Sequence, residues 1–190
     1  IIIPVYNVEK YVKRCPDSVF NQQFSKSIEV IAVDDFSTDN SLAVLKEYQK
    51  YENRLRIIEH SENKKLSRAR LSGIQAAAGE YIMNVDSDDL LLPNAIESLY
   101  NLISIRKVDV LVFNYIRDNN KGSKSLIHAI KHDKYVSNKT EVFDLFVGAC
   151  WNKIVKRDLL SDIIYGNIGL NSEEDLIFSA EILFKSNTIF

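Results

Sequence analysis

Short apolar runs alternate with helical patterns along this chain, and the alternation limits its fold more than any other feature. The runs cover residues 1–5, 29–33, 55–58, 81–85 and 108–113, with 154–155 as a weaker candidate. Each run is apolar at nearly every position, as in strands that are buried on both faces. Strands of this kind separated by helices form a parallel sheet with helices on both faces. The sequence therefore predicts an α/β fold, doubly wound, with a mostly parallel sheet.

The helical patterns carry start and stop signals of their own. Residues 41–51 place apolar side chains at helical spacing, with Thr38 or Asp39 available as the N-cap. Residues 66–78 are rich in alanine and stop at Gly79, which we expect to be the C-cap.

A proline complicates the first helical pattern, over residues 9–22. Pro16 has no N–H to donate and its ring clashes with the preceding turn, so we expect a kink or a restart there. The helix over 94–106 meets no such conflict, because Pro93 precedes it.

The pattern changes after Tyr115 without a linker or an internal repeat. Residues 117–134 are polar and indicate an exposed loop, and two helices are expected near 140–147 and 173–185. We expect residues 116–190 to extend the same domain as a second wall over the strand ends.

One domain of ordinary size is expected for residues 1–190. The chain begins at Ile1 within a strand pattern and ends at Phe190 within an apolar run. Both features indicate a piece of a longer protein, incomplete at each end.

Charge and cysteine content bear on the partners and the compartment that we expect for this chain. The net charge of −2 gives no electrostatic reason to expect binding to nucleic acid or to an anionic membrane. No apolar run reaches the 18 residues of a membrane-spanning helix. Cys15 and Cys150 lie far apart in sequence and are expected to be reduced thiols. We therefore expect a cytoplasmic location, with association at the inner face of the membrane as an alternative.

Three carboxylates follow the apolar run at residues 81–85 directly. Asp86, Asp88 and Asp89 stand where this strand should end, and ligands of open α/β sheets bind at the carboxyl ends of strands. Crowded carboxylates raise one another's pKa unless a cation compensates. Mg²⁺ or Mn²⁺ would do so and would share its oxygen ligands with substrate phosphates. The motif predicts a metal-diphosphate site.

A second acidic pair, Asp34 and Asp35, ends the run at residues 29–33. A turn followed by a helix cap would explain Asp39, but it explains paired acids at a strand end less well. We expect at least one of the pair to contact a ligand. A receiver domain also carries acids after its first strand, but it would not need the residues beyond Tyr115.

Several short segments recur in order along the chain. They read IIPVYN (2–7), SVFNQ (18–22), VDDFSTD (33–39), LSRAR (66–70), GEY (79–81), DSDD (86–89), WNK (151–153) and ED (174–175). Together they resemble glycosyltransferase family 2, inverting enzymes of the GT-A fold that use nucleotide-sugar donors. The resemblance implies a donor-binding half at 1–115, an acceptor-side half at 116–190, and a bacterial pathway of capsule or other cell-surface polysaccharide synthesis.

The resemblance assigns four residues to the donor nucleotide. Pro4 and Tyr6 would line its pocket, with the tyrosine ring against the base, and Asp35 would accept a hydrogen bond from uracil N3–H. Arg70 would lie near the nucleotide-sugar, where its planar fork suits phosphate oxygens. A UDP-sugar is the implied donor.

The resemblance assigns the DxD pair to Asp86 and Asp88. Asp88 would ligate Mn²⁺ or Mg²⁺, Asp86 would lie toward the ribose and the metal, and Asp89 would face the donor sugar. A divalent ion would neutralise the charge on the departing nucleoside diphosphate.

Asp175 matches the catalytic base that deprotonates the acceptor hydroxyl. Trp151, Lys153 and Glu174 match the segment on the acceptor side. The acceptor would be a saccharide or a lipid-linked molecule. Two alternatives remain open: a sugar nucleotidyltransferase, although no glycine-rich phosphate loop is present, and a nucleotide-sugar-binding domain without turnover.

Plainer interpretations of the same residues also remain open. Tyr6 and Trp151 could be core aromatics, and Arg70 could be a solvated helix residue. Residues 173–175 could owe their acids to the start of a helix, where the macrodipole favours negative charge.

The histidines and Phe36 carry expectations about the surface and about one turn. His60, His128 and His132 lack ligand spacing and fall in polar stretches, so we expect them at the surface. Phe36 occupies a position where the family more often has glycine, which should alter the turn after Asp35.

Overall fold

Six of the described strands form two three-stranded sheets that meet edge to edge. The first has the order β1-β2-β3 and the second the order β4-β8-β5. A parallel bridge between Ile2 and Asn84 joins β1 to the end of β4, and Val85 N donates to Ile2 O at 2.9 Å. The strands are β1 (Ile2–Val5), β2 (Val30–Asp34), β3 (Leu55–Glu59), β4 (Tyr81–Met83), β5 (Val110–Val112) and β8 (Lys153–Lys156).

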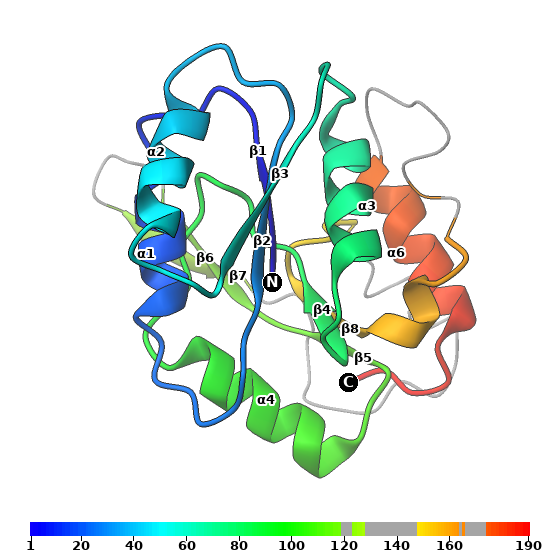
Figure 1. Ribbon diagram of the computed structural model, residues 1–190. Coiled ribbons are helices and arrows are strands. Elements are labelled where there is room, and N and C mark those ends of the chain that lie inside the picture. Colours follow the sequence, from blue (N-terminus) through cyan, green and yellow to red (C-terminus); the bar gives the residue numbers. More distant parts are fainter. Residues whose placement is uncertain (119–122, 128–147, 164, 166–173) are drawn as a thin grey trace.

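The sheet is mostly parallel, as the sequence predicts. Strands β1, β2 and β3 pair in parallel, whereas β8 is antiparallel to both β4 and β5. This computed structural model (Figure 1) describes residues 1–118, 123–127, 148–163, 165 and 174–190.

Helices cover both faces of the sheet and create two separate cores. In Figure 1, α1 and α2 lie on one side of the strands and α3 and α6 on the other. Ile2 belongs to the core beneath α3 and α6, whereas Ile3 and Val5 belong to the opposite core. Alternate side chains of a strand point to opposite faces, so a wholly apolar strand serves both cores. The helices are α1 (Arg14–Phe20), α2 (Ser41–Gln49), α3 (Leu66–Ala76), α4 (Ala95–Arg106) and α6 (Glu174–Lys185).

Two helix ends differ in detail from the sequence pattern. The restart expected at Pro16 takes the form of a helix that begins at Arg14, so Pro16 sits in the first turn, where no intrahelical N–H is needed. Gly79 is not the C-cap of α3, because the helix ends at Ala76 and Ala77 is already extended. The N–H of Gly79 instead donates to Glu29 Oε1 at 2.8 Å.

The expected loop over 117–134 is wrong in part. β6 (Tyr115–Asp118) and β7 (Lys124–Ile127) pair as an antiparallel hairpin. Their side chains are mostly exposed, so the strands carry polar residues without the apolar pattern of the buried sheet. The helix expected near 140–147 lies outside the described residues.

No helix in the described part of the chain has the length and apolar character needed to cross a membrane.

Gly73 brings α3 close to the sheet. A Cβ at this position would stand 2.5 Å from Ile2 Cγ2 and 3.3 Å from Val33 Cγ2. Ile2 and Val33 are β-branched and fully buried, so neither side chain has room to rotate away. The helix therefore packs on β1 and β2 at a distance that only glycine allows.

We predict that Gly73→Ala lowers the free energy of unfolding by about 1–3 kcal/mol, because it overpacks this contact. Thermal unfolding followed by circular dichroism would show a fall of about 2–4 °C per kcal/mol. Gly79→Ala is the matched control, since its Cβ would meet Tyr81 O at an ordinary 3.4 Å. Equal stability of the two variants would contradict the packing argument.

Candidate functional site

The carboxyl ends of β1, β2 and β4 bring three sequence-predicted residues to one edge of the sheet. Asp35 N donates to Val5 O at 2.8 Å, which ties the end of β2 to the end of β1. The Ile2–Asn84 bridge places β4 on the other side of β1. Tyr6, Asp35 and Asp86 therefore follow three neighbouring strands.

The aromatic side chains at this edge are exposed. Tyr6 is 48% exposed, which excludes the core interpretation, while Pro4 is buried beside it in β1. Phe36 is 50% exposed and has a left-handed backbone with φ of 64°. A left-handed position favours glycine, which explains why Phe36 is unusual at this turn.

The two acids at the end of β2 have different surroundings. Asp34 Oδ2 accepts a hydrogen bond from Ser37 N at 3.1 Å, so Asp34 organises the turn. Asp35 is 3% exposed, and its Oδ1 accepts from Lys64 N at 2.8 Å and pairs with His60 Nδ1 at 2.7 Å.

The surface position expected for His60 is wrong. His60 is only 9% exposed, and its Nε2 lies 2.9 Å from Ser72 Oγ. Its polar sequence neighbours concealed this burial, because they point outward while the imidazole turns toward Asp35. His128 and His132 lie outside the described residues.

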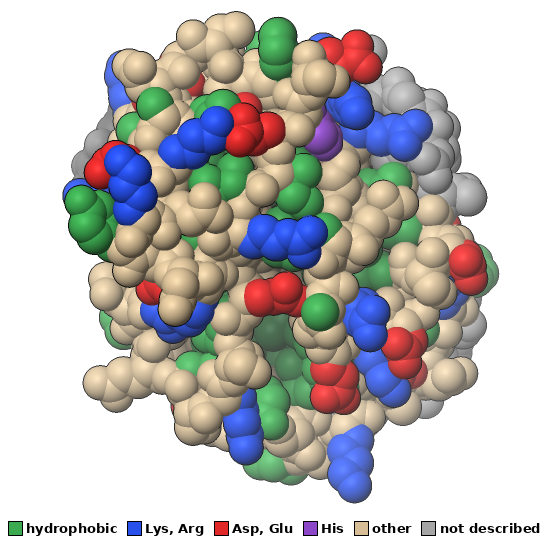
Figure 2. All heavy atoms as spheres, in the orientation of Figure 1, with side chains coloured by type: hydrophobic (Ala, Val, Ile, Leu, Met, Phe, Trp, Pro, Cys, Tyr) green, Lys and Arg blue, Asp and Glu red, His purple; other side chains and the backbone are tan. Residues whose placement is uncertain are grey.

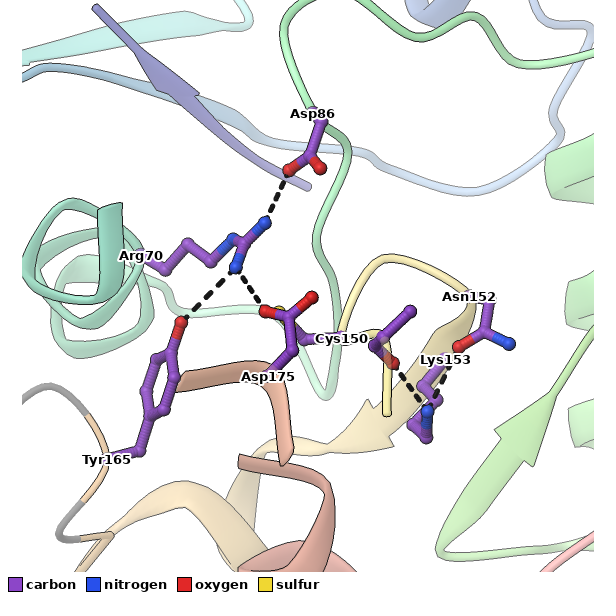
Figure 3. Close-up of polar contacts among 8 residues, drawn as sticks. Arg70, Asp86, Cys150, Asn152, Lys153, Tyr165 and Asp175 are labelled. Carbon is purple, nitrogen blue, oxygen red and sulfur yellow. Dashed lines mark hydrogen bonds and ion pairs between the residues drawn. The ribbon is translucent and has the colours of Figure 1, made fainter. Parts of the chain in front are cut away.

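Arg70 connects the two acidic parts of the site (Figure 3). Its Nη2 donates to Asp86 Oδ1 at 2.6 Å and its Nη1 to Asp175 Oδ1 at 2.5 Å. The guanidinium is 1% exposed, which excludes the solvated interpretation. Nη1 also lies 3.5 Å from the hydroxyl of Tyr165, an interaction that sequence patterns do not signal. The expected contact between Arg70 and phosphate stays a prediction.

Asp175 lies in the first turn of α6, where the helix dipole favours a negative charge. Its side chain is 27% exposed, so it is held from one side and open on another. Cys150 Sγ donates to the same Oδ1 that Arg70 contacts. Burial raises the pKa of Cys150 well above its usual value, so this group is a neutral thiol. Cys15 and Cys150 are both free, as expected.

The acids after β4 crowd one another. Asp89 N donates to Asp86 O at 2.9 Å in a tight turn, and Asp88 is exposed. Desolvation, together with the charges of Asp86 and Asp88, raises the pKa of Asp89 to about 6. Within the described residues, no three His, Cys, Asp or Glu side chains gather as a complete metal cage. A divalent cation bound together with ligand phosphate oxygens would relieve the repulsion among these carboxylates.

Side chains of α1 and of Gln22, just beyond its end, hold the loop that follows β4 (residues 86–92, the acidic loop), a role that sequence reasoning missed. Cys15 Sγ donates to Asp86 O at 3.5 Å, and Ser18 Oγ accepts from Leu91 N at 3.1 Å. Gln22 Nε2 donates to Leu92 O at 2.9 Å. Cys15 and Ser18 lie three positions apart and share one face of α1, whereas Gln22 lies just beyond the helix, which ends at Phe20. Their spacing within the SVFNQ segment and just before it is the signal that could have revealed this role.

Two of the residues assigned to the acceptor side, Trp151 and Lys153, lie at the start of β8. The ring of Trp151 is half-buried and lies edge-on to Tyr115, with centroids 4.6 Å apart. Lys153 is buried and donates to Ala149 O and Asn152 Oδ1. Burial lowers the pKa of Lys153 to about 8. Glu174 is half-buried at the start of α6.

Charge on the visible face of the molecule is mixed. Figure 2 shows lysine and arginine side chains interspersed with acidic ones over this face, without a large field of one sign. The distribution agrees with the net charge of −2.

Comparison with known sequences shows that this chain is similar to glycosyltransferases. The poly(ribitol-phosphate) beta-glucosyltransferase of Bacillus spizizenii is 33% identical over 193 residues, which cover 100% of this chain and 30% of that protein. Glycosyltransferase GlyA of Streptococcus pneumoniae is 29% identical over 207 residues, with 100% of this chain and 30% of its own length covered. The chain thus spans about a third of these curated relatives.

Comparison with solved structures gives the same fold. Staphylococcus aureus TarS 1–349 in complex with UDP-GlcNAc superposes with a TM-score of 0.84 at 27% identity, covering 99% of this chain and 54% of the other. Its complex with UDP gives 0.83 at 25% identity, with 99% and 55% covered. These neighbours confirm the expected GT-A fold. The sequence also matches the family model described as Glycosyl transferase family 2 over residues 1–164, so the chain belongs to that family.

Proposed function

We propose that this chain transfers a sugar, with inversion, from a nucleotide-diphosphate sugar to a hydroxyl of a saccharide or lipid-linked acceptor. The observation that carries the proposal is the double ion pair of Arg70, which holds Asp86 on the donor side next to Asp175. An inverting displacement needs the leaving diphosphate and the base on opposite sides of the reacting carbon. The Arg70 bridge fixes Asp86 and the proposed base Asp175 within one site, and the proposal places the reacting sugar between the diphosphate and Asp175.

A UDP-sugar is the donor that we propose. TarS, one of the structural neighbours, is described in complexes with UDP and with UDP-GlcNAc. The poly(ribitol-phosphate) glycosyltransferases among the relatives support an acceptor in cell-surface polymer synthesis.

In the mechanism, Asp175 removes the proton of the acceptor hydroxyl as that oxygen attacks the anomeric carbon. Arg70 keeps the carboxylate oriented, and the Cys150 thiol donates to the same oxygen, so the proton goes to the other one. Asp88, with Asp86, would hold Mn²⁺ or Mg²⁺ at the diphosphate, and Asp89 would face the donor sugar. A bound ion of this kind supplies Lewis-acid stabilisation of the leaving group. Tyr6 and Asp35 bind and orient the nucleoside.

The test separates donor binding from turnover. We predict that Asp175→Asn lowers the rate of UDP-sugar hydrolysis at least about 10²-fold, because it removes the general base. The same variant should keep the rise in unfolding temperature that UDP with Mn²⁺ produces. At a ligand concentration of 100 times the dissociation constant, this rise corresponds to roughly 2.7 kcal/mol of added free energy of unfolding. Asp88→Ala should lose that shift. Equal, negligible hydrolysis by the wild type and Asp175→Asn would instead indicate a binding module without turnover.

The acidic loop should respond to pH and to metal. The folded-state pKa of Asp89 is raised from its model-compound value of 3.8 to about 6, so its charged form is disfavoured in the folded protein. Asp89→Asn should therefore raise the unfolding temperature at pH 7.5 without divalent ions. The gain should shrink as the pH falls from about 6 toward 4, where the folded protein already carries a proton on Asp89. Thermal scans from pH 4 to 8 would measure it, and a gain independent of pH would contradict the charge argument.

Arg70 should be irreplaceable by lysine. A lysine ammonium cannot donate to Asp86 and Asp175 with the fork geometry of the guanidinium. We predict that Arg70→Lys lowers the free energy of unfolding by about 1–3 kcal/mol. This loss is smaller than the loss expected on breaking a fully buried ion pair, because both acids are partly exposed. Arg68→Lys, at an exposed position of the same helix, should change it by no more than about 0.5 kcal/mol. Urea unfolding would compare them, and equal effects would refute the bridge.

A further inference from the structure

His60 links three elements beneath the nucleotide end of the site. It follows β3, and its N–H donates to Asp34 O at 2.9 Å, so its backbone is fixed against β2. Its Nδ1 lies 2.7 Å from Asp35 Oδ1 and its Nε2 lies 2.9 Å from Ser72 Oγ on α3. The side chains of His60 and Asp35 are 5% and 4% exposed. The ring is therefore held at both nitrogens, away from solvent.

The partners of His60 fix which nitrogen carries a proton. An ionised carboxylate only accepts hydrogen bonds, so Nδ1 must be protonated and donate to Asp35. The hydroxyl of Ser72 can donate or accept, so it completes the Nε2 side. Ser72 thereby fixes the ring in the orientation that serves Asp35.

The two carboxylate oxygens of Asp35 differ in the hydrogen bonds that they accept. Oδ1 accepts from His60 Nδ1 and from Lys64 N at 2.8 Å, which uses both of its lone pairs. Oδ2 receives no hydrogen bond from the described residues. Asp35 therefore offers one acceptor oxygen to an incoming ring, where a carboxylate without His60 would offer two.

We infer that His60 is a positioning residue that makes Asp35 select uracil. Uracil presents one N–H, at N3, between two carbonyl groups, and it needs a single acceptor. Guanine presents adjacent N1–H and N2–H₂ donors, which would pair best with both oxygens of a carboxylate. Cytosine has an acceptor at N3, which Asp35 repels. The inference rests on the proposed function, because it takes Asp35 as the residue that contacts the base.

Two matched substitutions test the inference by isothermal titration of UDP, GDP and CDP with Mn²⁺. The amide nitrogen of asparagine stands near the position of Nδ1, so His60→Asn retains the donor to Asp35. The amide of glutamine reaches toward the position of Nε2, so His60→Gln leaves Oδ1 short of one donor. We expect the wild type to prefer UDP. His60→Gln should bind UDP roughly tenfold more weakly and lose about tenfold in preference for UDP over GDP. His60→Asn should stay within about threefold of the wild type for both values.

The ratio between nucleotides separates positioning from a merely structural role. A structural defect weakens UDP, GDP and CDP alike, and that result would overturn the inference. Ser72→Ala is a milder variant that leaves the contact with Asp35 in place, and it should shift the UDP-to-GDP preference in the same direction as His60→Gln. An unchanged preference in Ser72→Ala and His60→Gln would overturn the inference while leaving the proposed function intact. A wild type that binds none of the three nucleotides would overturn the proposed function itself.

Discussion

The guanidinium of Arg70 is the contact on which the site depends. It comes from α3, which Gly73 seats close against β1 and β2, and it meets one acid from the end of β4 and another from α6. Burying a cation is costly unless it is paired, and two carboxylates meet that requirement here. The ion pairs in turn hold α6 against the carboxyl ends of the strands. The same geometry places the proposed base next to the proposed donor site.

The acids around Arg70 are supported from several directions, so that the site is built before a ligand arrives. Cys15, Ser18 and Gln22 fix the backbone of the loop after β4. His60 with Lys64 fixes the carboxylate of Asp35. The side chains proposed to meet a ligand are Tyr6, Asp35, Asp175 and the acids of the loop. Preorganisation of this kind limits the ordering cost of binding.

Much of the fold could be predicted, because it follows from local patterns. The six strands of the two three-stranded sheets lie within a few residues of the apolar runs. Asp35 directly follows β2, and Asp86 follows β4 after Asn84 and Val85. The hairpin of β6 and β7 was missed because exposed strands carry no apolar signal. His60 was misplaced for a related reason: its burial depends on Asp35 and Ser72, which are 25 and 12 positions away.

The amino-acid sequence alone determines the order of elements, the two-sided burial of the sheet and the types of chemical group at the strand ends. These features follow from periodicity and composition, which act over a few residues. The pairing of those groups is a property of the packed molecule. Arg70 and Asp175 lie 105 positions apart, and no local pattern relates them. Their contact exists because α3 and α6 pack on the same face of the sheet, which brings one helix's cation to the other helix's first turn. Packing of the helices on the sheet brings acids that are scattered in the sequence to one arginine, and together these residues form the site.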